Sequence, residues 1–255
     1  MKVVLLAGGF GTRLSEETSL RPKPMIEIGE MPLIMHIMHN FAAQGFNDFI
    51  ICLGYKGFVI KEYFANLHLH LSDLKFASVS APPIITRNKV LDWKVELVDT
   101  GLHTMTGGRI KRIQELTHKQ PFLLTYGDGL ADINLSELIE FHKRSGGWAT
   151  VTAVNPPARF GALEFDSDGR VSSFNEKIEN NLTWINGGFF VLEQQVFDYI
   201  EDDFTVWEKD PLADLARAGK LNAYKHRGFW KPCDTLREKR ELEELWNIGA
   251  PWKNW

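Results

Sequence analysis

The sequence contains few cysteines. Among 255 residues there are two, Cys52 and Cys233, and neither belongs to a CxxC pattern or lies near a cluster of histidines. A disulfide framework and a cysteine-based zinc site are therefore excluded, and we expect two free thiols in a reducing compartment.

Long hydrophobic runs are also missing. No stretch of about 18 consecutive apolar residues occurs, so the sequence predicts no membrane-spanning helix. The opening "MKVVLLAGG" carries a single basic residue and lacks the small-residue cleavage site of a signal peptide, and it is better interpreted as a first strand. We expect a cytoplasmic protein.

The chain has no excess of positive charge. It carries 29 Lys and Arg against 33 Asp and Glu, a formal net charge of -4. A broad nucleic-acid-binding surface is therefore not expected, although a few local cations would suffice for a small anionic substrate. Internal repeats and low-complexity tracts are absent, so the length favours one large domain.

Apolar runs and amphipathic stretches alternate along the chain, and Gly or Pro separates many of them. This alternation predicts an α/β fold: a Rossmann-like, doubly wound, mostly parallel central sheet with helices on both faces, and a smaller part made of a β-hairpin and C-terminal helices. Strands are expected at 2–7, 48–54, 92–100, 121–129, 148–154, 183–192 and 221–226, helices at 32–45, 58–67, 107–116, 135–147, 195–201, 210–218 and 235–249, and a hairpin over 161–177 that turns at Asp168-Gly169. The segment 68–92 is the least regular.

A glycine-rich loop follows the first predicted strand, in "LLAGGFGTRL" at 5–14. Gly8, Gly9 and Gly11 would let backbone N–H groups approach phosphate oxygens, and Thr12 and Arg13 would add a hydroxyl and a cation. The GxGxxG pattern fails because Leu14 stands where the third glycine belongs, and the phosphate-loop pattern fails because no Gly-Lys-[Ser/Thr] follows. A plain glycine-rich turn is the alternative.

A second segment, "RPKPMIEIG" at 21–29, holds Lys23 between Pro22 and Pro24. Two prolines restrict the backbone, so the ammonium would be placed reproducibly. Taken alone, a solvated lysine in a turn would be the better interpretation.

Together, "LAGGFGTRL" and "PKPM" resemble the nucleotidyltransferase family that makes nucleotide sugars from sugar 1-phosphates. Within that family the resemblance is strongest to members that use CTP and glucose 1-phosphate, and it extends over nearly the whole chain. It is carried by "SEET" (15–18), "DFIICLGYKGFVIKEYFAN" (48–66), "VDTG" (98–101), "MTGGRIKR" (105–112), "TYGDGLADI" (125–133), "RFGALEF" (159–165), "INGGFFV" (185–191), "FWKPCDTLREK" (229–239) and "APWKNW" (250–255). Segment 68–92 matches poorly.

The resemblance implies a single nucleotidyltransferase domain over 1–255, with a nucleotide-binding half at 1–134, a sugar-phosphate-binding half at 135–235 and a C-terminal helix and tail at 236–255. The implied reaction is Mg²⁺-dependent: glucose 1-phosphate attacks the α-phosphorus of CTP, pyrophosphate leaves and CDP-glucose forms. Positioning and charge neutralisation would drive such a transfer.

Site residues follow from the resemblance. Arg13 would hold the departing pyrophosphate, Lys23 would neutralise the α-phosphate, and Asp128 and Asp234 would bind Mg²⁺. The nucleotide-binding set is Leu6, Ala7, Gly8, Gly9, Phe10, Gly11, Thr12, Arg13, Lys23, Thr104, Arg109 and Gly127. From the residues alone, Asp128 could be a turn aspartate, Asp234 a helix N-cap, and Arg109 an ordinary helix-surface arginine.

The sugar phosphate would be bound by Glu176, Lys177, Asn186 and Gly187, with Gly188 adding open backbone and Trp230 a wall of the sugar site. Ile178 stands where the family pattern often has proline, and a surface ion pair is the alternative for Glu176 and Lys177.

Three other functions remain open: the same chemistry with UTP or dTTP, a catalytically silent binder of nucleotide sugars, and a transferase that uses a nucleotide sugar as donor. His36 and His39 are interpreted as packing residues because no acidic partners accompany them. Trp246, Trp252 and Trp255 in the tail suggest an exposed interface. The resemblance implies a homo-oligomer, for which a hexamer is a candidate.

Overall fold

A seven-stranded sheet forms the centre of the molecule. The computed structural model describes residues 1–88, 91–156, 162–165, 170–175 and 183–255. The sheet has the order β14-β10-β13-β8-β1-β4-β7. Its strands are β1 (Val3–Leu6), β4 (Asp48–Leu53), β7 (Lys94–Asp99), β8 (Phe122–Tyr126), β10 (Ala149–Val154), β13 (Ile185–Leu192) and β14 (Leu221–Lys225). β13 is antiparallel to both neighbours and the remaining pairs are parallel, so the predicted mostly parallel sheet is confirmed.

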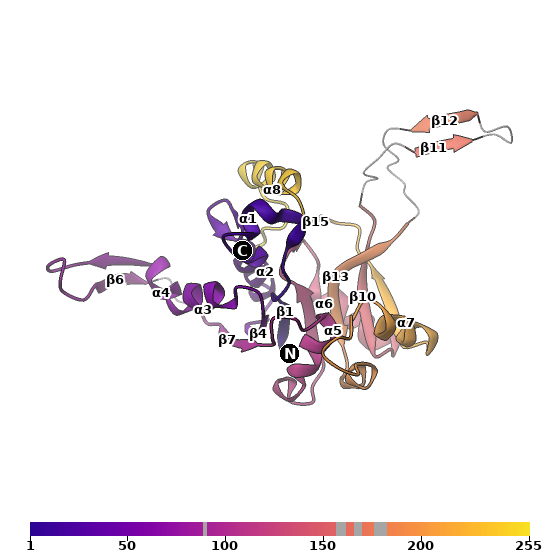
Figure 1. The fold of residues 1–255 in the computed structure, drawn as a ribbon, viewed down its shortest axis with the longest axis horizontal. Coiled ribbons are helices and arrows are strands. Elements are labelled where there is room, and N and C mark those ends of the chain that lie inside the picture. Colours follow the sequence, from indigo (N-terminus) through magenta and orange to yellow (C-terminus); the bar gives the residue numbers. More distant parts are fainter. Residues whose placement is uncertain (89–90, 157–161, 166–169, 176–182) are drawn as a thin grey trace.

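Two hydrophobic cores lie on the two faces of this sheet. Along β1 the side chains alternate, with Val3 and Leu5 in one core and Val4 and Leu6 in the other. The first core is covered by α2 (Leu33–Ala42), α3 (Gly57–Ala65), α6 (Leu135–Ser145) and α8 (Leu236–Ile248), and the second by α5 (Thr106–Arg112), the 3₁₀ helix η4 (Gln194–Tyr199) and α7 (Asp210–Arg217). Helices therefore cover both faces, as predicted, and Figure 1 shows this layering.

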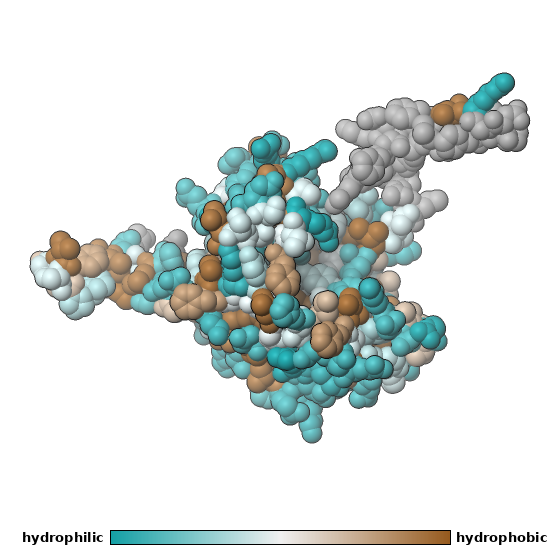
Figure 2. Space-filling view, in the orientation of Figure 1, coloured by the Kyte–Doolittle hydropathy of each residue, from teal (hydrophilic) through white to brown (hydrophobic). Residues whose placement is uncertain are grey.

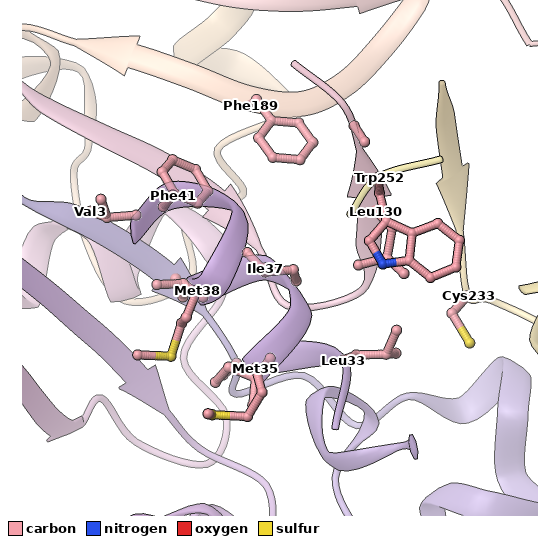
Figure 3. Close-up of a cluster of buried hydrophobic side chains, with 14 of the residues drawn as sticks. Val3, Leu33, Met35, Ile37, Met38, Phe41, Leu130, Phe189, Cys233 and Trp252 are labelled. Atoms are coloured by element: carbon pink, nitrogen blue, oxygen red, sulfur yellow. The ribbon is translucent and has the colours of Figure 1, made fainter. Parts of the chain in front are cut away.

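The C-terminal tail packs into the first core. Figure 3 shows the indole of Trp252 beside Leu130 and near Cys233, with the apolar side chains of α2 in the same cluster. Trp252 is fully buried, and its indole N–H donates to Nδ1 of His36 at 3.2 Å. The expectation of an exposed aromatic interface at the tail is thus wrong for Trp252, because this tryptophan fills a cavity of its own chain.

His36 and His39 have the packing role predicted for them. His36 is buried and its Nε2 lies 2.8 Å from the carbonyl oxygen of Ile28, while the ring of His39 stacks on Trp255 with centroids 5.3 Å apart. Cys52 and Cys233 are free and buried, as expected, and burial raises the pKa of each thiol to about 12. In the part of the chain that the structure describes, no helix combines the length and apolarity needed to cross a membrane.

The segment 68–92 is more regular than expected. It contains β5 (Ser72–Lys75) and β6 (Ile84–Asn88), which pair antiparallel after the short helix α4 (Leu67–His70). Figure 1 shows this hairpin projecting from the body beyond α3. It carries the exposed apolar residues Phe76, Val79, Ile84 and Ile85, and hydrophobic patches are visible there in Figure 2. Further along the chain, the predicted hairpin is present as β11 (Ala162–Phe165) and β12 (Val171–Asn175), while its Asp168-Gly169 turn lies outside the described residues.

Two short antiparallel pairs were not predicted. β2 (Glu27–Ile28) pairs with β3 (Met31–Pro32), and β9 (Gly129–Ala131) pairs with β15 (Trp230–Pro232). In the second pair Gly129 faces Pro232, and the backbone N–H of Cys233 donates to the carbonyl oxygen of Asp128 at 2.9 Å. This pair brings two distant parts of the chain together at the edge of the site described next.

Candidate active site

A cavity of about 720 Å³ lies beyond the carboxyl ends of β1 and β8. Ligands of open α/β sheets bind at this end of the strands. The cavity is lined by Leu6, Ala7, Gly8, Gly9, Phe10, Gly11, Thr12, Arg13, Lys23, Pro24, Leu102, His103, Thr104, Met105, Thr106, Arg109, Tyr126, Gly127, Asp128, Phe204 and Asp234. Every residue predicted to bind nucleotide or metal is among them.

The glycine loop begins where β1 ends. Gly11 has φ of 65°, a left-handed conformation that favours glycine, and the 3₁₀ turn Thr12–Leu14 follows it. An added Cβ at Gly8 would lie 2.3 Å from Cζ of Arg109, whereas an added Cβ at Gly9 would meet no atom within 4 Å. Gly8 is therefore required by close packing, and Gly9 leaves its side of the cavity open.

Two carboxylates and two cations meet at one end of the cavity. The ammonium of Lys23 donates to Oδ2 of Asp128 at 2.6 Å and also to Oδ1 of Asp234, while Arg13 donates to Oδ2 of Asp234 at 2.7 Å. The side chain of Lys23 is 12% exposed and that of Arg13 is 77% exposed. Lys23 thus belongs to the floor of the cavity and Arg13 to its rim.

This arrangement sets the charge state of Lys23. Burial by itself lowers the pKa of the ammonium, but the neighbouring carboxylates of Asp128 and Asp234 outweigh burial and hold that pKa above its ordinary value. Lys23 is therefore a permanent cation at neutral pH.

Asp234 does not cap the helix that follows it. The N-cap of α8 is Thr235, whose hydroxyl accepts from the backbone N–H of Glu238 at 3.2 Å, and the carboxylate of Glu238 accepts from the backbone N–H of Asp234 at 2.8 Å. This arrangement resembles a capping box, except that Glu238 accepts from the residue before the N-cap and not from the N-cap itself. Its geometry leaves the carboxylate of Asp234 directed at Lys23 and Arg13.

Arg109 is a buried residue rather than the helix-surface arginine that its local sequence suggests. It is 4% exposed, and its guanidinium donates to the carbonyl oxygens of Leu53 at 2.8 Å, Gly101 at 2.8 Å and Gly8 at 3.0 Å, and to the hydroxyl of Thr100 at 2.7 Å. Burial lowers the pKa of this guanidinium. Arg109 therefore links the loop after β1, the end of β4 and the loop after β7. Its hydrogen bond to Gly8 holds the glycine loop in place.

The residues predicted to bind the sugar phosphate are only partly described. Asn186 is exposed at the start of β13, where its side chain accepts from the backbone N–H of Gly188 at 2.8 Å. Gly187 is buried, and its carbonyl oxygen accepts from the indole of Trp230 at 2.7 Å. Neither Asn186 nor Gly187 lines the cavity, and Glu176 and Lys177 lie outside the described residues.

Several cavity residues were not predicted from the sequence. They are Pro24, Leu102, His103, Met105, Thr106, Tyr126 and Phe204. Of these, Leu102, Met105 and Phe204 are exposed apolar side chains. Phe10 is also exposed, and its ring centroid lies 6.0 Å from that of His103, which follows Leu102 in the cavity wall. The cavity therefore has an apolar part as well as its charged end. Exposed apolar residues have no periodicity that would reveal such a wall in advance.

Comparisons with known proteins agree on one family for this chain. The model of the nucleotidyl transferase family matches residues 2–231. Similar curated proteins include a glucose-1-phosphate cytidylyltransferase of Salmonella typhi, 54% identical over 100% of both chains, and a probable glucose-1-phosphate cytidylyltransferase of Bacillus subtilis, 43% identical over 100% of both.

More distant matches include a sequence relative and a solved structure. A mannose-1-phosphate guanyltransferase of Emericella nidulans is 31% identical over 90% of this chain and 60% of its own length. A solved putative glucose-1-phosphate thymidylyltransferase of Bacillus anthracis superposes with a TM-score of 0.68 at 16% identity, covering 100% of this chain and 97% of the other. The predicted resemblance is confirmed: the chain belongs to the nucleotidyl transferase family.

Proposed function

We propose that this protein transfers CMP from CTP to α-D-glucose 1-phosphate in a Mg²⁺-dependent reaction, releasing pyrophosphate and forming CDP-glucose. The full-length similarity to glucose-1-phosphate cytidylyltransferases supports this choice of substrates. The observation that carries the proposal is the cluster of Lys23, Asp128 and Asp234 at one end of the cavity. A reaction between two phosphate-bearing substrates needs this concentration of opposite charges.

The two carboxylates fit a small divalent cation. Asp128 and Asp234 each direct an oxygen at one ammonium, so both can face a single cation. Mg²⁺ takes one or two carboxylates from protein and fills its other positions with water and phosphate oxygens. When bound, Mg²⁺ would neutralise charge on the triphosphate.

The side chains of this protein would then act as follows. Lys23 would neutralise the α-phosphate where charge develops, and Arg13, which is exposed and can move, would hold the departing pyrophosphate. Backbone N–H groups of the glycine loop would contact phosphate oxygens, with Gly9 leaving the approach open. The sugar phosphate would be bound by Glu176, Lys177 and Asn186.

The position of the base follows from the shape of the cavity. Because the triphosphate belongs at the charged end, the nucleoside would occupy the part of the cavity lined by Phe10, Leu102, Met105 and Phe204. Thr104 lies beside Met105 in this wall. Arg109 would contribute by holding Gly8 and the loop at Gly101 in place.

One assay separates this function from its alternatives. The purified protein is incubated with glucose 1-phosphate, Mg²⁺ and each nucleoside triphosphate separately, and pyrophosphate is measured. We expect release with CTP. Release with UTP or dTTP but not CTP would contradict the choice of base, and no release with any triphosphate would favour a silent binder of nucleotide sugars.

We also propose that the protein is a homo-oligomer, with a hexamer as one candidate. The support is the β5–β6 hairpin, which projects from the body and exposes Phe76, Ile84 and Ile85. Light scattering after size exclusion would test it: the Phe76→Asp and Ile84→Asp variants should have a lower mass than the unaltered protein, and a monomeric unaltered protein would contradict the proposal.

A further inference from the structure

The carboxylate of Glu208 lies behind two hydroxyl groups of the cavity wall. One of its oxygens, Oε1, accepts from the phenol of Tyr126, and the other, Oε2, accepts from the hydroxyl of Thr106 at 2.6 Å. Thr106 and Tyr126 both line the cavity, whereas Glu208 does not. Glu208 is thus in contact with two parts of the site without being part of its surface.

On the nucleotide side, the hydroxyl of Thr106 has a fixed direction. Its oxygen accepts from the backbone N–H of Trp207 at 2.9 Å, so its own proton is directed at Glu208. Trp207 is fully buried and its ring packs edge-on against Phe190, with centroids 6.2 Å apart. The core therefore anchors the residue next to Glu208.

The loop that carries Glu208 is also joined to the first turn of α5 by backbone contacts. The N–H of Met105 donates to the carbonyl oxygen of Asp203 at 2.8 Å, and the N–H of Gly107 donates to that of Thr205 at 2.9 Å. An added Cβ at Gly107 would lie 2.7 Å from the oxygen of Thr205, and one at Gly108 would lie 2.5 Å from Cα of Asp203. These contacts require glycine, so the loop and the first turn of α5 form one unit.

On the sugar side, Tyr126 ends β8 and precedes Gly127 and Asp128. Its phenol donates to Glu208, and its ring lies 2.7 Å from where a Cβ of Gly188 would stand, two residues after Asn186. Tyr126 therefore donates to Glu208 from the end of β8, next to the charged end of the cavity.

We infer that Glu208 is a positioning residue that holds Thr106 at the nucleotide end and Tyr126 at the sugar end of the site, so that both substrates are bound in one shared geometry. The inference rests on the proposed function and adds a residue to it. Because Glu208 does not line the cavity, its loss should weaken the binding of both substrates rather than remove a reacting group.

The first test compares KM values for CTP and for glucose 1-phosphate. Glu208→Ala should raise both by about five- to tenfold, because two charge-assisted hydrogen bonds are lost together. Glu208→Gln should recover part of this loss, because its amide oxygen can still accept from one of the two hydroxyls whereas its NH₂ group cannot accept from the other. Glu201→Ala is the matched control: Glu201 is exposed at the start of the same loop, and within the described part of the chain it has no recorded hydrogen bond or ion pair. Unchanged KM values in Glu208→Ala would overturn the inference.

The second test separates the two bonds. Thr106→Val should raise mainly the KM for CTP, and Tyr126→Phe mainly the KM for glucose 1-phosphate. Each of these substitutions should raise KM by a smaller factor in the Glu208→Ala variant than in the unaltered protein, because its hydrogen-bond partner is already missing there. If Glu208→Ala does not fold, Thr106→Val and Tyr126→Phe test the inference by themselves. It would be overturned if each of these variants raised the KM for CTP and the KM for glucose 1-phosphate by the same factor.

Failure of the proposed function can be told apart from failure of the inference. If the unaltered protein releases no pyrophosphate with any triphosphate, the proposed function is wrong. Titration calorimetry with CTP and with CDP-glucose then tests the same variants. Weaker binding by Glu208→Ala with partial recovery in Glu208→Gln would still support a positioning role for Glu208. Equal affinities of Glu208→Ala and the unaltered protein would contradict that role.

Discussion

Asp128 and Asp234 accept hydrogen bonds from the same ammonium, that of Lys23. One carboxylate lies near the middle of the chain and the other near its C-terminus, and they meet because β9 pairs with β15, with Cys233 donating to the carbonyl oxygen of Asp128. The pairing of two three-residue strands therefore assembles the charged end of the cavity. Lys23 and Arg13 together balance the charge of the two acids.

The first prediction concerns these acids. Asp128→Asn and Asp234→Asn should each lower turnover by on the order of a hundredfold or more, because the amide keeps the size of the side chain but loses the charge that a hard cation requires. Pyrophosphate release at saturating CTP and Mg²⁺ measures the effect. The melting temperature should remain near that of the unaltered protein.

Asp198→Asn serves as the control for this prediction, because Asp198 is exposed and does not line the cavity. It should behave like the unaltered protein. Near-normal turnover in Asp128→Asn or in Asp234→Asn would show that the altered acid does not hold the metal.

The second prediction concerns Arg109. Arg109→Met should destabilise the protein by about 2–4 kcal/mol, because the carbonyl oxygens of Gly8, Leu53 and Gly101 lose a buried charged donor. Arg109→Lys should recover only part of this loss, since an ammonium cannot reproduce the fork of the guanidinium. Urea unfolding gives the free energies, and the KM for CTP should rise in both variants.

Arg112→Met is the matched control on the same helix. Arg112 forms an exposed ion pair with Asp203 at 2.5–2.8 Å, and exposed pairs contribute little to stability. Equal destabilisation by Arg109→Met and Arg112→Met would contradict the role assigned to Arg109.

The sequence predicted the central fold well because its elements are periodic. The continuous apolar runs at β1 and β4 are buried on both faces, and the Gly and Pro boundaries of α2 and α6 lie within a few residues of the observed ends. The predicted nucleotide loop also lines the cavity. It follows the first buried strand, and the cavity of an open α/β sheet lies beyond the carboxyl ends of its strands.

The rest could not be predicted, for physical reasons that differ by residue. β9 and β15 are too short for any periodicity, so the meeting of Asp128 with Asp234 came only from the family resemblance. Arg109 looked like a surface residue because its partners are mostly backbone carbonyls, which have no sequence signature. Trp252 was predicted to lie at an exposed interface, because an aromatic residue in a tail does not reveal that α2 of its own chain covers it.

The third prediction uses two neighbouring glycines. Gly8→Ala should destabilise the protein, because its methyl group would overlap the guanidinium of Arg109 at 2.3 Å. Gly9→Ala should leave the melting temperature unchanged, since no atom lies within 4 Å of its added methyl group, yet it should raise the KM for CTP by narrowing the cavity. Thermal melting and steady-state kinetics separate the two effects. Equal melting temperatures for both variants would contradict the packing at Gly8.

The last prediction concerns pH and His36. Burial lowers the pKa of its imidazole to about 4 in the folded protein, whereas an unfolded histidine has a pKa of about 6.5. Between these values the unfolded chain binds more protons than the folded one, so stability is fully present above about pH 6.5 and falls as the pH drops toward 4. At about 1.4 kcal/mol per pKa unit, His36 should account for a loss of about 2–3 kcal/mol near pH 4.5.

Urea unfolding at pH 7.5 and at pH 4.5 tests this, compared between the unaltered protein and His36→Gln. The glutamine amide can still donate to the carbonyl oxygen of Ile28 but does not titrate, so the variant should lose less stability on acidification even if it is less stable at pH 7.5. His68→Gln, at an exposed position of α4, should retain the pH dependence of the unaltered protein. Parallel pH curves for His36→Gln and the unaltered protein would mean that His36 is not held neutral by its burial against Trp252.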